Sequence, residues 1–273
     1  MNGKRLWKIV KSAGGWILSL IVLLPIYFIL VNSLKTQMEA GSMNFSLPAS
    51  PQWGNYVEAI QRGNLVRSFF NSLFIASASV VICVFVTSMA AFILARRKTR
   101  TNRLVYNYFF LGLVAPLNYI MTIFVLKALQ LQNTYWGIIL VYVAANIPFL
   151  MFLFHGFIGG IPKELDEAAV VDGSGLFVLF FRIIFPLLKP VTITGLVLNF
   201  LGAWNDFITP LYLLNDQRKL GMVNSIYNFF GYHFNDWNLI FADVAMTIMP
   251  VLVLYMFGQR YIISGMTNGS VKG

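Results

Sequence analysis

Long apolar stretches alternate with short polar ones along this chain of 273 residues. Four stretches contain no residue that is charged at neutral pH: 12–34, 68–95, 104–126 and 128–162. Each is at least as long as the roughly 20 apolar residues that a helix needs to cross the core of a bilayer. The pattern therefore predicts four membrane-spanning segments.

Two further apolar stretches, 191–205 and 244–259, are shorter. Each reaches spanning length only if Asp206 or Asp243 lies near a membrane interface or faces protein rather than lipid. Because a bilayer core supplies no water to the backbone, such stretches must be helical, and the short alternating segments of a β-barrel are not seen. We predict an all-α membrane protein of a single domain, 1–273, with six transmembrane helices over about 12–34, 69–95, 104–126, 135–157, 183–209 and 241–260.

Composition supports a membrane protein, with 58% hydrophobic and only 11% charged residues. Soluble domains are usually about a quarter charged. The first span could instead be a cleaved signal peptide, since basic residues precede its apolar run. No small-residue cleavage site follows it, and five more apolar segments do, so we expect a retained helix.

Basic residues favour the cytoplasmic side of a membrane, which orients the chain. With the amino terminus inside, fourteen of the twenty basic residues lie in inside segments: Lys4, Arg5, Lys8, Lys11, Arg96, Arg97, Lys98, Arg100, Arg103, Lys163, Arg182, Lys189, Arg260 and Lys272. We therefore expect both termini and the loop at about 158–182 to be cytoplasmic. This arrangement also accounts for the net charge of +10, so a nucleic-acid partner is not needed to explain it.

Catalytic and metal-binding patterns are missing from the sequence. No HExxH, CxxC, GxSxG or Walker-type nucleotide motif occurs, and neither histidine has the neighbours that a metal site needs. Asp206 and Asp243 could form an acid–base pair, but nothing in the sequence brings them together. We expect no enzymatic activity, no catalytic residue, no metal and no cofactor in this chain.

The loop at 158–182 holds four of the ten carboxylates, Glu164, Asp166, Glu167 and Asp172. An early proline and carboxylates in the first turn predict a short helix starting near Pro162, because negative charge complements the helix dipole there. Gly173 should end this helix in a left-handed conformation. The small residues Ala168 and Ala169 would lie on its surface and permit close approach of another protein. A solvated loop that merely joins two spans is the alternative.

The same stretch resembles the EAA motif of permeases of ATP-binding-cassette importers, in Glu167, Ala168, Ala169, Gly173 and Pro186. Other similar stretches are LVNSLKT at 30–36, FFNSLFIA at 69–76, FILARRK at 92–98, LGAWNDFITPL at 201–211 and QRYIISGMTNGSVKG at 259–273. Together, and above all in the VKG tail, they resemble the second permease subunit of maltose-type carbohydrate importers. The pattern departs from many relatives at Ser174 and Gly175.

The resemblance implies the type I importer permease fold and a multi-pass protein of a bacterial or archaeal cell membrane. The short helix would dock on a separate ATPase and transmit its movement to the membrane helices, through Glu167, Ala168, Ala169, Asp172 and Gly173. ATP and magnesium would be bound by two ATPase subunits. The other implied partners are a second homologous permease, an extracytoplasmic solute-binding protein, a sugar and the lipid bilayer.

Two more groups of residues are candidates for contact under this resemblance. The polar or ring-bearing residues that could line the solute path are Asn146, Asn199, Trp204, Asn205 and Asp206; helix-to-helix hydrogen bonding is the alternative role for each. Those suited to contact the binding protein are Tyr227, Tyr232 and Trp237, although they could instead anchor helix ends at the membrane interface.

Other transport functions stay open at this stage. A permease for a polyol or for glycerol phosphate is one alternative, although a phosphate ester would favour basic residues along the path, and the spans contain few. An ion-coupled secondary transporter is another, but it would need ionisable groups within the membrane, for which only Asp206 and Asp243 qualify. It would also leave the acidic loop unexplained.

Overall fold

The computed structural model describes residues 3–231 and 235–268, and these residues confirm the all-α prediction. Within these two ranges, the one departure from helices, turns and loops is an isolated antiparallel bridge between Phe230 and Asn235. The chain forms two compact units. Unit 1 comprises Met1–Val66 and Ser225–Met249, and unit 2 comprises Arg67–Asn224 and Pro250–Gly273.

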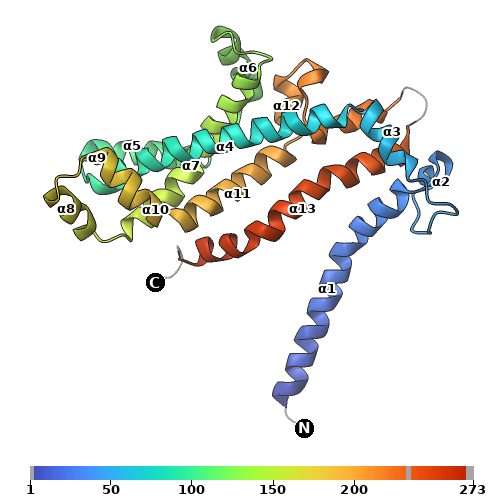
Figure 1. Cartoon of the computed structure of the whole chain (residues 1–273), viewed down its shortest axis with the longest axis horizontal. Helices are drawn as coiled ribbons and strands as arrows, with labels where there is room; N and C mark the ends of the chain where they lie inside the picture. Colours follow the sequence, from blue (N-terminus) through green and yellow to red (C-terminus); the bar gives the residue numbers. More distant parts are fainter. Residues whose placement is uncertain (1–2, 232–234, 269–273) are drawn as a thin grey trace. The chain divides into compact units, whose positions relative to one another are not determined.

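Three long helices form the body of unit 2: α4 (Leu65–Arg96), α7 (Tyr135–Gly159) and α11 (Lys189–Asn205) (Figure 1). The core is densest along α7, where Leu150, Phe154 and Ile158 are completely buried. Gly195 of α11 allows the two helices to approach closely, because a Cβ atom there would lie only 2.7 Å from Leu150 Cδ2. The shorter α5 (Arg100–Leu111) also packs on α7.

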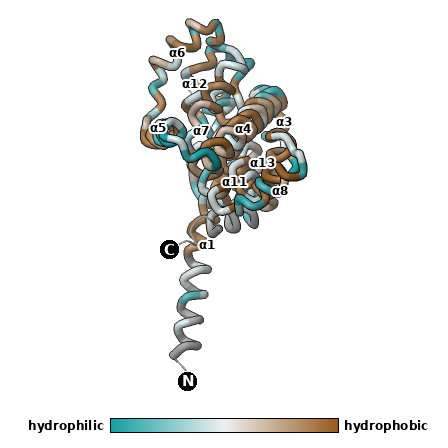
Figure 2. Tube along the Cα trace, turned by 90° about the vertical axis from the view of Figure 1, so that its left-hand side faces the viewer, coloured by the Kyte–Doolittle hydropathy of each residue, from teal (hydrophilic) through white to brown (hydrophobic). Residues whose placement is uncertain are grey.

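The predicted third span is not one continuous helix. Residues 104–126 are divided between α5 and α6 (Tyr119–Ala128) by a non-helical segment, 112–118. Pro116 lies in this segment rather than inside a helix, as expected for a residue that lacks an N–H and disfavours helix before it. Asn118 then caps α6, its Oδ1 accepting a hydrogen bond from Met121 N at 3.0 Å. In Figure 2 the start of α5 is hydrophilic, whereas α6 is mainly hydrophobic.

The predicted fifth span is also shorter and bent. The segment Leu176–Leu187, which includes α9 (Leu176–Val178), a π-helical stretch (Leu179–Ile184) and α10 (Phe185–Leu187), meets α11 at an angle of 75°. The break falls just before Pro190, which cannot donate a backbone hydrogen bond. Beyond α11 the chain continues through α12 (Ile208–Leu213) and a 3-10 turn, Gln217–Lys219.

Four helices of the described residues are long and apolar enough to cross a membrane, and the bent segment would be a fifth if it counts as one span. The four stretches are Gly14–Ser33, Leu65–Arg96, Tyr135–Gly159 and Trp237–Gln259. The last belongs to α13 (Trp237–Asn268), which extends beyond the predicted 241–260 at both ends.

Unit 1 contains α1 (Gly3–Ser33), α2 (Gln37–Gly41), α3 (Gly54–Arg62) and the first part of α13. A capping box begins α2: Thr36 accepts from Glu39 N, and the Glu39 carboxylate accepts from Thr36 N. The hydrogen bond from the Thr36 backbone lowers the pKa of Glu39. The end of α1 is therefore followed at once by a well-ordered turn.

Asn55 of α3 connects three parts of unit 1. Its buried Nδ2 donates to Ser33 O and to Lys35 O, both at 2.8 Å, and its Oδ1 accepts from Asn238 Nδ2 at 2.8 Å. The carbonyl acceptors lie at the end of α1, where helical partners are missing. The side-chain amide of Asn55 thus forms hydrogen bonds both with backbone carbonyls at the end of α1 and with a side chain of α13.

We predict that Asn55→Leu destabilises the protein by on the order of 2–4 kcal/mol, because it leaves buried polar groups without partners. Thermal unfolding of the detergent-purified chain would measure this as a lowered Tm. Gln61→Leu, on the exposed side of the same helix, is the matched control and should change the Tm little. Equal effects of the two substitutions would show that the Asn55 hydrogen bonds are unimportant.

Candidate functional site

The acidic loop forms the short helix that the sequence predicts, α8 (Glu164–Val171). Glu164, Asp166 and Glu167 occupy its first turn, where they complement the helix dipole. Gly173 has a φ of +77°, and the backbone N–H of Ser174 donates to Ala169 O at 2.9 Å. This is the hydrogen bond of a glycine-terminated helix end, so the predicted role of Gly173 as a helix stop is confirmed.

One of the two alanines does not lie on the surface as expected. Ala169 is 3% exposed and belongs to the hydrophobic core of unit 2, whereas Ala168 and Glu167 are exposed. Ala169 shares the inner face of α8 with Asp166, three residues earlier, because residues three apart lie on one side of a helix. The outward face that another protein could touch is therefore narrower, and Glu167, Ala168 and Asp172 remain on it.

An ion pair that the sequence analysis does not predict holds α8 to the membrane helices. Arg96, at the end of α4, places Nε 2.7 Å from Asp166 Oδ2, and its Nη2 donates to Asp166 Oδ1 at 3.1 Å. Its Nη1 donates to Ile161 O at 3.0 Å. Both side chains are largely buried, at 11% and 17% exposed. We call this the Arg96–Asp166 clamp, and it fixes the first turn of α8 directly to α4.

We predict that Arg96→Gln loosens α8, because a neutral side chain cannot maintain the ion pair with Asp166. Breaking a largely buried pair should cost roughly 2–4 kcal/mol locally. Hydrogen exchange of peptides covering 161–172 would detect the loosening as faster exchange. Arg97→Gln, the exposed neighbour, removes the same charge and should leave exchange unchanged; identical exchange in both variants would contradict the clamp.

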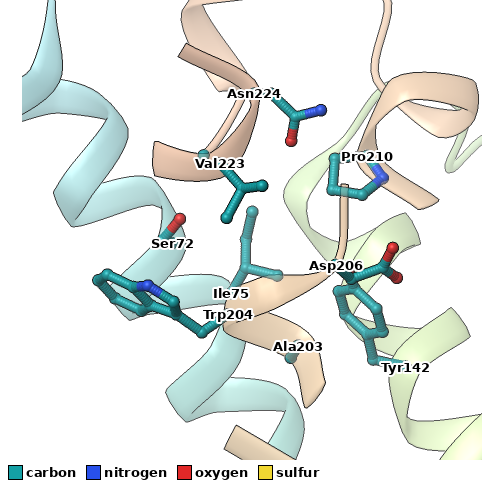
Figure 3. A pocket seen from close by; sticks show the side chains of 10 residues that line it. Ser72, Ile75, Tyr142, Ala203, Trp204, Asp206, Pro210, Val223 and Asn224 are labelled. Carbon is teal, nitrogen blue, oxygen red and sulfur yellow. The ribbon is translucent and has the colours of Figure 1, made fainter. Parts of the chain in front are cut away.

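A small pocket lies among α4, α7 and the end of α11 in unit 2 (Figure 3). Asp206 and Tyr142 lie on one side of it, and Trp204 with Ser72 lies on the other. The cavity volume is about 10 Å³, which is room for about one water molecule. In this conformation the pocket therefore cannot hold a sugar ring.

The five residues predicted for the solute path are only partly brought together. Trp204 and Asp206 line the pocket, but Asn146, Asn199 and Asn205 do not. Asn146 Nδ2 and Asn199 Nδ2 each donate to a carbonyl four residues earlier in their own helix, at 2.9 and 2.7 Å. Trp204 is buried with its ring between Phe69 and Phe200, and Asn205 is exposed.

Asp206 lies past the end of α11, not within the fifth helix as expected. Its Oδ1 accepts from the backbone N–H of Ile208 at 2.9 Å and of Thr209 at 3.1 Å. It therefore provides the side-chain acceptor at the start of α12, as aspartate commonly does before a helix. The spacing of Asp206 before the next helical turn is the signal that sequence reasoning could have used.

We predict that Asp206→Asn preserves transport, because an amide oxygen can still accept both backbone hydrogen bonds. Asp206→Leu cannot, and should destabilise the turn by about 1 kcal/mol and lower transport. Uptake of solute into proteoliposomes would compare the two. If Asp206→Asn abolished uptake as completely as Asp206→Leu, the charge itself would be required, as in an ion-coupled carrier.

Two of the three residues predicted to contact a binding protein, Tyr227 and Trp237, are described, and both lie in unit 1. Tyr227 is 45% exposed and packs near Phe230, with ring centroids 6.4 Å apart. Trp237 is half-buried at the start of α13, between Phe230 and Phe241. Tyr232 lies outside the described residues. Of the two described side chains, Tyr227 is thus the more accessible.

Residues 84–268 match a family model described as "Binding-protein-dependent transport system inner membrane component". The chain is 34% identical over 259 residues, 94% of each chain, to the probable starch degradation products transport system permease protein AmyC of Thermoanaerobacterium thermosulfurigenes. It is 35% identical to the melibiose/raffinose/stachyose import permease protein MelC of Bacillus subtilis, over 92% of this chain and 91% of that one.

A solved structure has the same fold. It is a chain of a bacterial ABC transporter involved in the import of the acidic polysaccharide alginate, with a TM-score of 0.84 and 21% sequence identity. The match covers 96% of this chain and 98% of that chain. At this identity the likeness shows the fold alone.

Proposed function

Because the chain belongs to the family of binding-protein-dependent transport system inner membrane components, we propose that it is the second permease subunit of an importer for carbohydrate, most of all for oligosaccharides. Its place in the family makes it a multi-pass permease that is not itself an ATPase. Energy must then come from another subunit. The proposed mechanism is alternating access driven by separate ATPases.

The proposed topology has six spans with both termini in the cytoplasm. The third span would be formed by α5 and α6 together, with the segment 112–118 between them covered by protein, since irregular backbone is tolerated at membrane depth only where protein or water meets it. The bent segment and α11 would form the fifth. The distribution of basic residues supports this orientation.

The observation that carries the mechanism is α8 with its clamp. An exposed, acid-rich helix of eight residues is fixed to α4 by a largely buried ion pair and ends at a left-handed glycine. A helix held this firmly can transmit movement, whereas a solvated loop would absorb it. We propose that Glu167, Ala168, Asp172 and Gly173 contact an ATPase subunit, while Ala169 supports the helix from below.

The proposed complex contains this chain, a second homologous permease, two ATPase subunits and an extracytoplasmic solute-binding protein. The family description names dependence on a binding protein. A second solved relative, with a TM-score of 0.61, is described in complex with an alginate pentasaccharide-bound periplasmic protein. In this chain Tyr227 and Trp237 are the described residues proposed for that contact.

The names of similar proteins support the proposed solute class. They include permeases for melibiose, raffinose and stachyose, for starch degradation products, and for arabinooligosaccharides. All of these solutes are carbohydrates. Trp204 and Asp206 would lie beside the path, and since the pocket holds about one water in this conformation, an open conformation would be needed for a sugar to pass.

We predict that Glu167→Lys abolishes sugar-stimulated ATP hydrolysis by the purified complex, because it reverses the charge on the outward face of α8. Hydrolysis would be measured with the binding protein and a panel of neutral oligosaccharides. Glu164→Lys makes the same charge change one helical turn away, outside the EAA motif, and should retain much of the activity.

Assembly is measured separately by co-purification of the ATPase. Full stimulation of Glu167→Lys in an intact complex would refute the docking role of α8. Absence of stimulation of the unaltered complex by any sugar, together with stimulation by a polyol or by glycerol phosphate, would refute the carbohydrate assignment while leaving the importer assignment intact.

A further inference from the structure

The loop between α2 and α3 in unit 1 (Figure 1) returns along α1 instead of extending into solvent. The Phe45 ring lies 5.1 Å from that of Phe28 and 6.5 Å from that of Tyr27, measured between centroids. The Tyr27 hydroxyl donates to Phe45 O at 3.2 Å. Asn32 Nδ2 donates to Asn44 O, also at 3.2 Å. The loop is therefore fixed beside the last two turns of α1.

These contacts show where the loop lies relative to the membrane span of α1. Tyr27 and Phe28 belong to the candidate membrane span Gly14–Ser33. Tyr27 precedes the end of that span by six residues, which corresponds to about 9 Å along a helix at 1.5 Å per residue. Phe45 thus lies at the level of the membrane span itself, below the point where α1 ends.

Three large apolar side chains of this loop are exposed. Met43, Phe45 and Leu47 are 43%, 56% and 73% exposed. Between them, Asn44 turns its Oδ1 toward the chain and accepts from Lys35 Nζ at 2.7 Å. Met43 has a φ of +46°, and Asn44 Oδ1 also accepts from Ser46 N at 3.1 Å, so the loop turns tightly and leaves three large apolar side chains exposed within five residues.

Lys35 holds this loop in place. It is 1% exposed, and its ammonium donates to Asn32 Oδ1 at 3.0 Å and to Asn44 O at 2.9 Å, in addition to Asn44 Oδ1. A buried ammonium requires such acceptors, since it loses its hydration on burial. Lys35 is thus a positioning residue that fastens Asn44 to the end of α1.

We propose that Met43, Phe45 and Leu47, which we call the outer wedge, insert among the lipids of the leaflet at the carboxyl end of α1. This leaflet is the outer one under the orientation inferred from the basic residues. The wedge would anchor the polar cap of unit 1 to the membrane surface. The proposal needs only that α1 spans the membrane, and it does not depend on the solute.

Lipid is the occupant that the wedge fits. Its three side chains carry no group that forms ordinary hydrogen bonds, whereas protein interfaces contain about one hydrogen bond per 100–200 Å². Trp53 also places the membrane surface near the carboxyl end of α1. Its side chain is 68% exposed, and the backbone N–H of its neighbour Gln52 donates to Leu34 O at that end of α1. Tryptophan is enriched in the headgroup layer of membranes.

The test uses nitroxide labels on the full chain, purified with the subunits that assemble with it and reconstituted in vesicles of phosphatidylethanolamine and phosphatidylglycerol. Cys83 is the single cysteine of the chain, so Cys83→Ala gives a background for Phe45→Cys and Leu47→Cys. Relaxation by oxygen, which concentrates in lipid, is compared with relaxation by a water-soluble nickel chelate. The matched control is Glu58→Cys on the exposed polar side of α3.

We expect the ratio of oxygen to nickel accessibility to be several-fold higher at positions 45 and 47 than at position 58. A ratio at 45 and 47 equal to that at 58 would mean that the wedge is in water and would overturn the proposal. Shielding from both reagents would mean that a protein partner covers it, and would overturn the proposal equally.

A second measurement avoids the label. Phe45→Trp in vesicles containing lipids brominated along the acyl chains should show stronger fluorescence quenching than Glu58→Trp. Equal quenching of the two variants would contradict insertion. Both substitutions are at exposed positions, and elution of the variant complexes with the unaltered complex in gel filtration confirms that they are folded.

Discussion

A bilayer core offers no water to the peptide backbone, and this constraint determines where the helices of this chain begin and end. Two breaks inside the apolar sequence have a side chain that replaces lost helical hydrogen bonds. Asn118 caps α6 after the gap at 112–118, and Asp206 accepts two backbone N–H groups before α12. Asn118 and Asp206, two polar residues of apolar segments, are therefore located at interruptions, whereas Asn146 and Asn199 bond within their own helices.

The sequence was sufficient for features that depend on local signals. Charge-free length predicted helical spans, and the acidic first turn with Gly173 predicted α8 to within about two residues. It was insufficient where packing decides. Residues 104–126 were predicted as one span, but the structure shows two helices there, and Ala169 was assigned to the surface because a short helix alone does not reveal which side meets the core.

The Arg96–Asp166 clamp shows most clearly what a single sequence cannot show. Its partners are 70 residues apart, and each belongs to a cluster of like charges, ARRK and the acidic loop, in which no member stands out. Only the fold selects the pair. The path residues illustrate the same limit, since Trp204 and Asp206 meet at one pocket while Asn146 and Asn199 bond within their own helices.

The 75° bend before α11 gives the chain a mechanical property of its own. The first arm of the bend is Leu176–Leu187 and the second is α11. Because they meet at 75°, only about a quarter of a displacement along the first arm, the cosine of 75°, is directed along the axis of α11. A displacement along the first arm would thus move α11 mostly sideways rather than along its own axis. A swing opens and closes a gap between helices, whereas a slide would only shift their register.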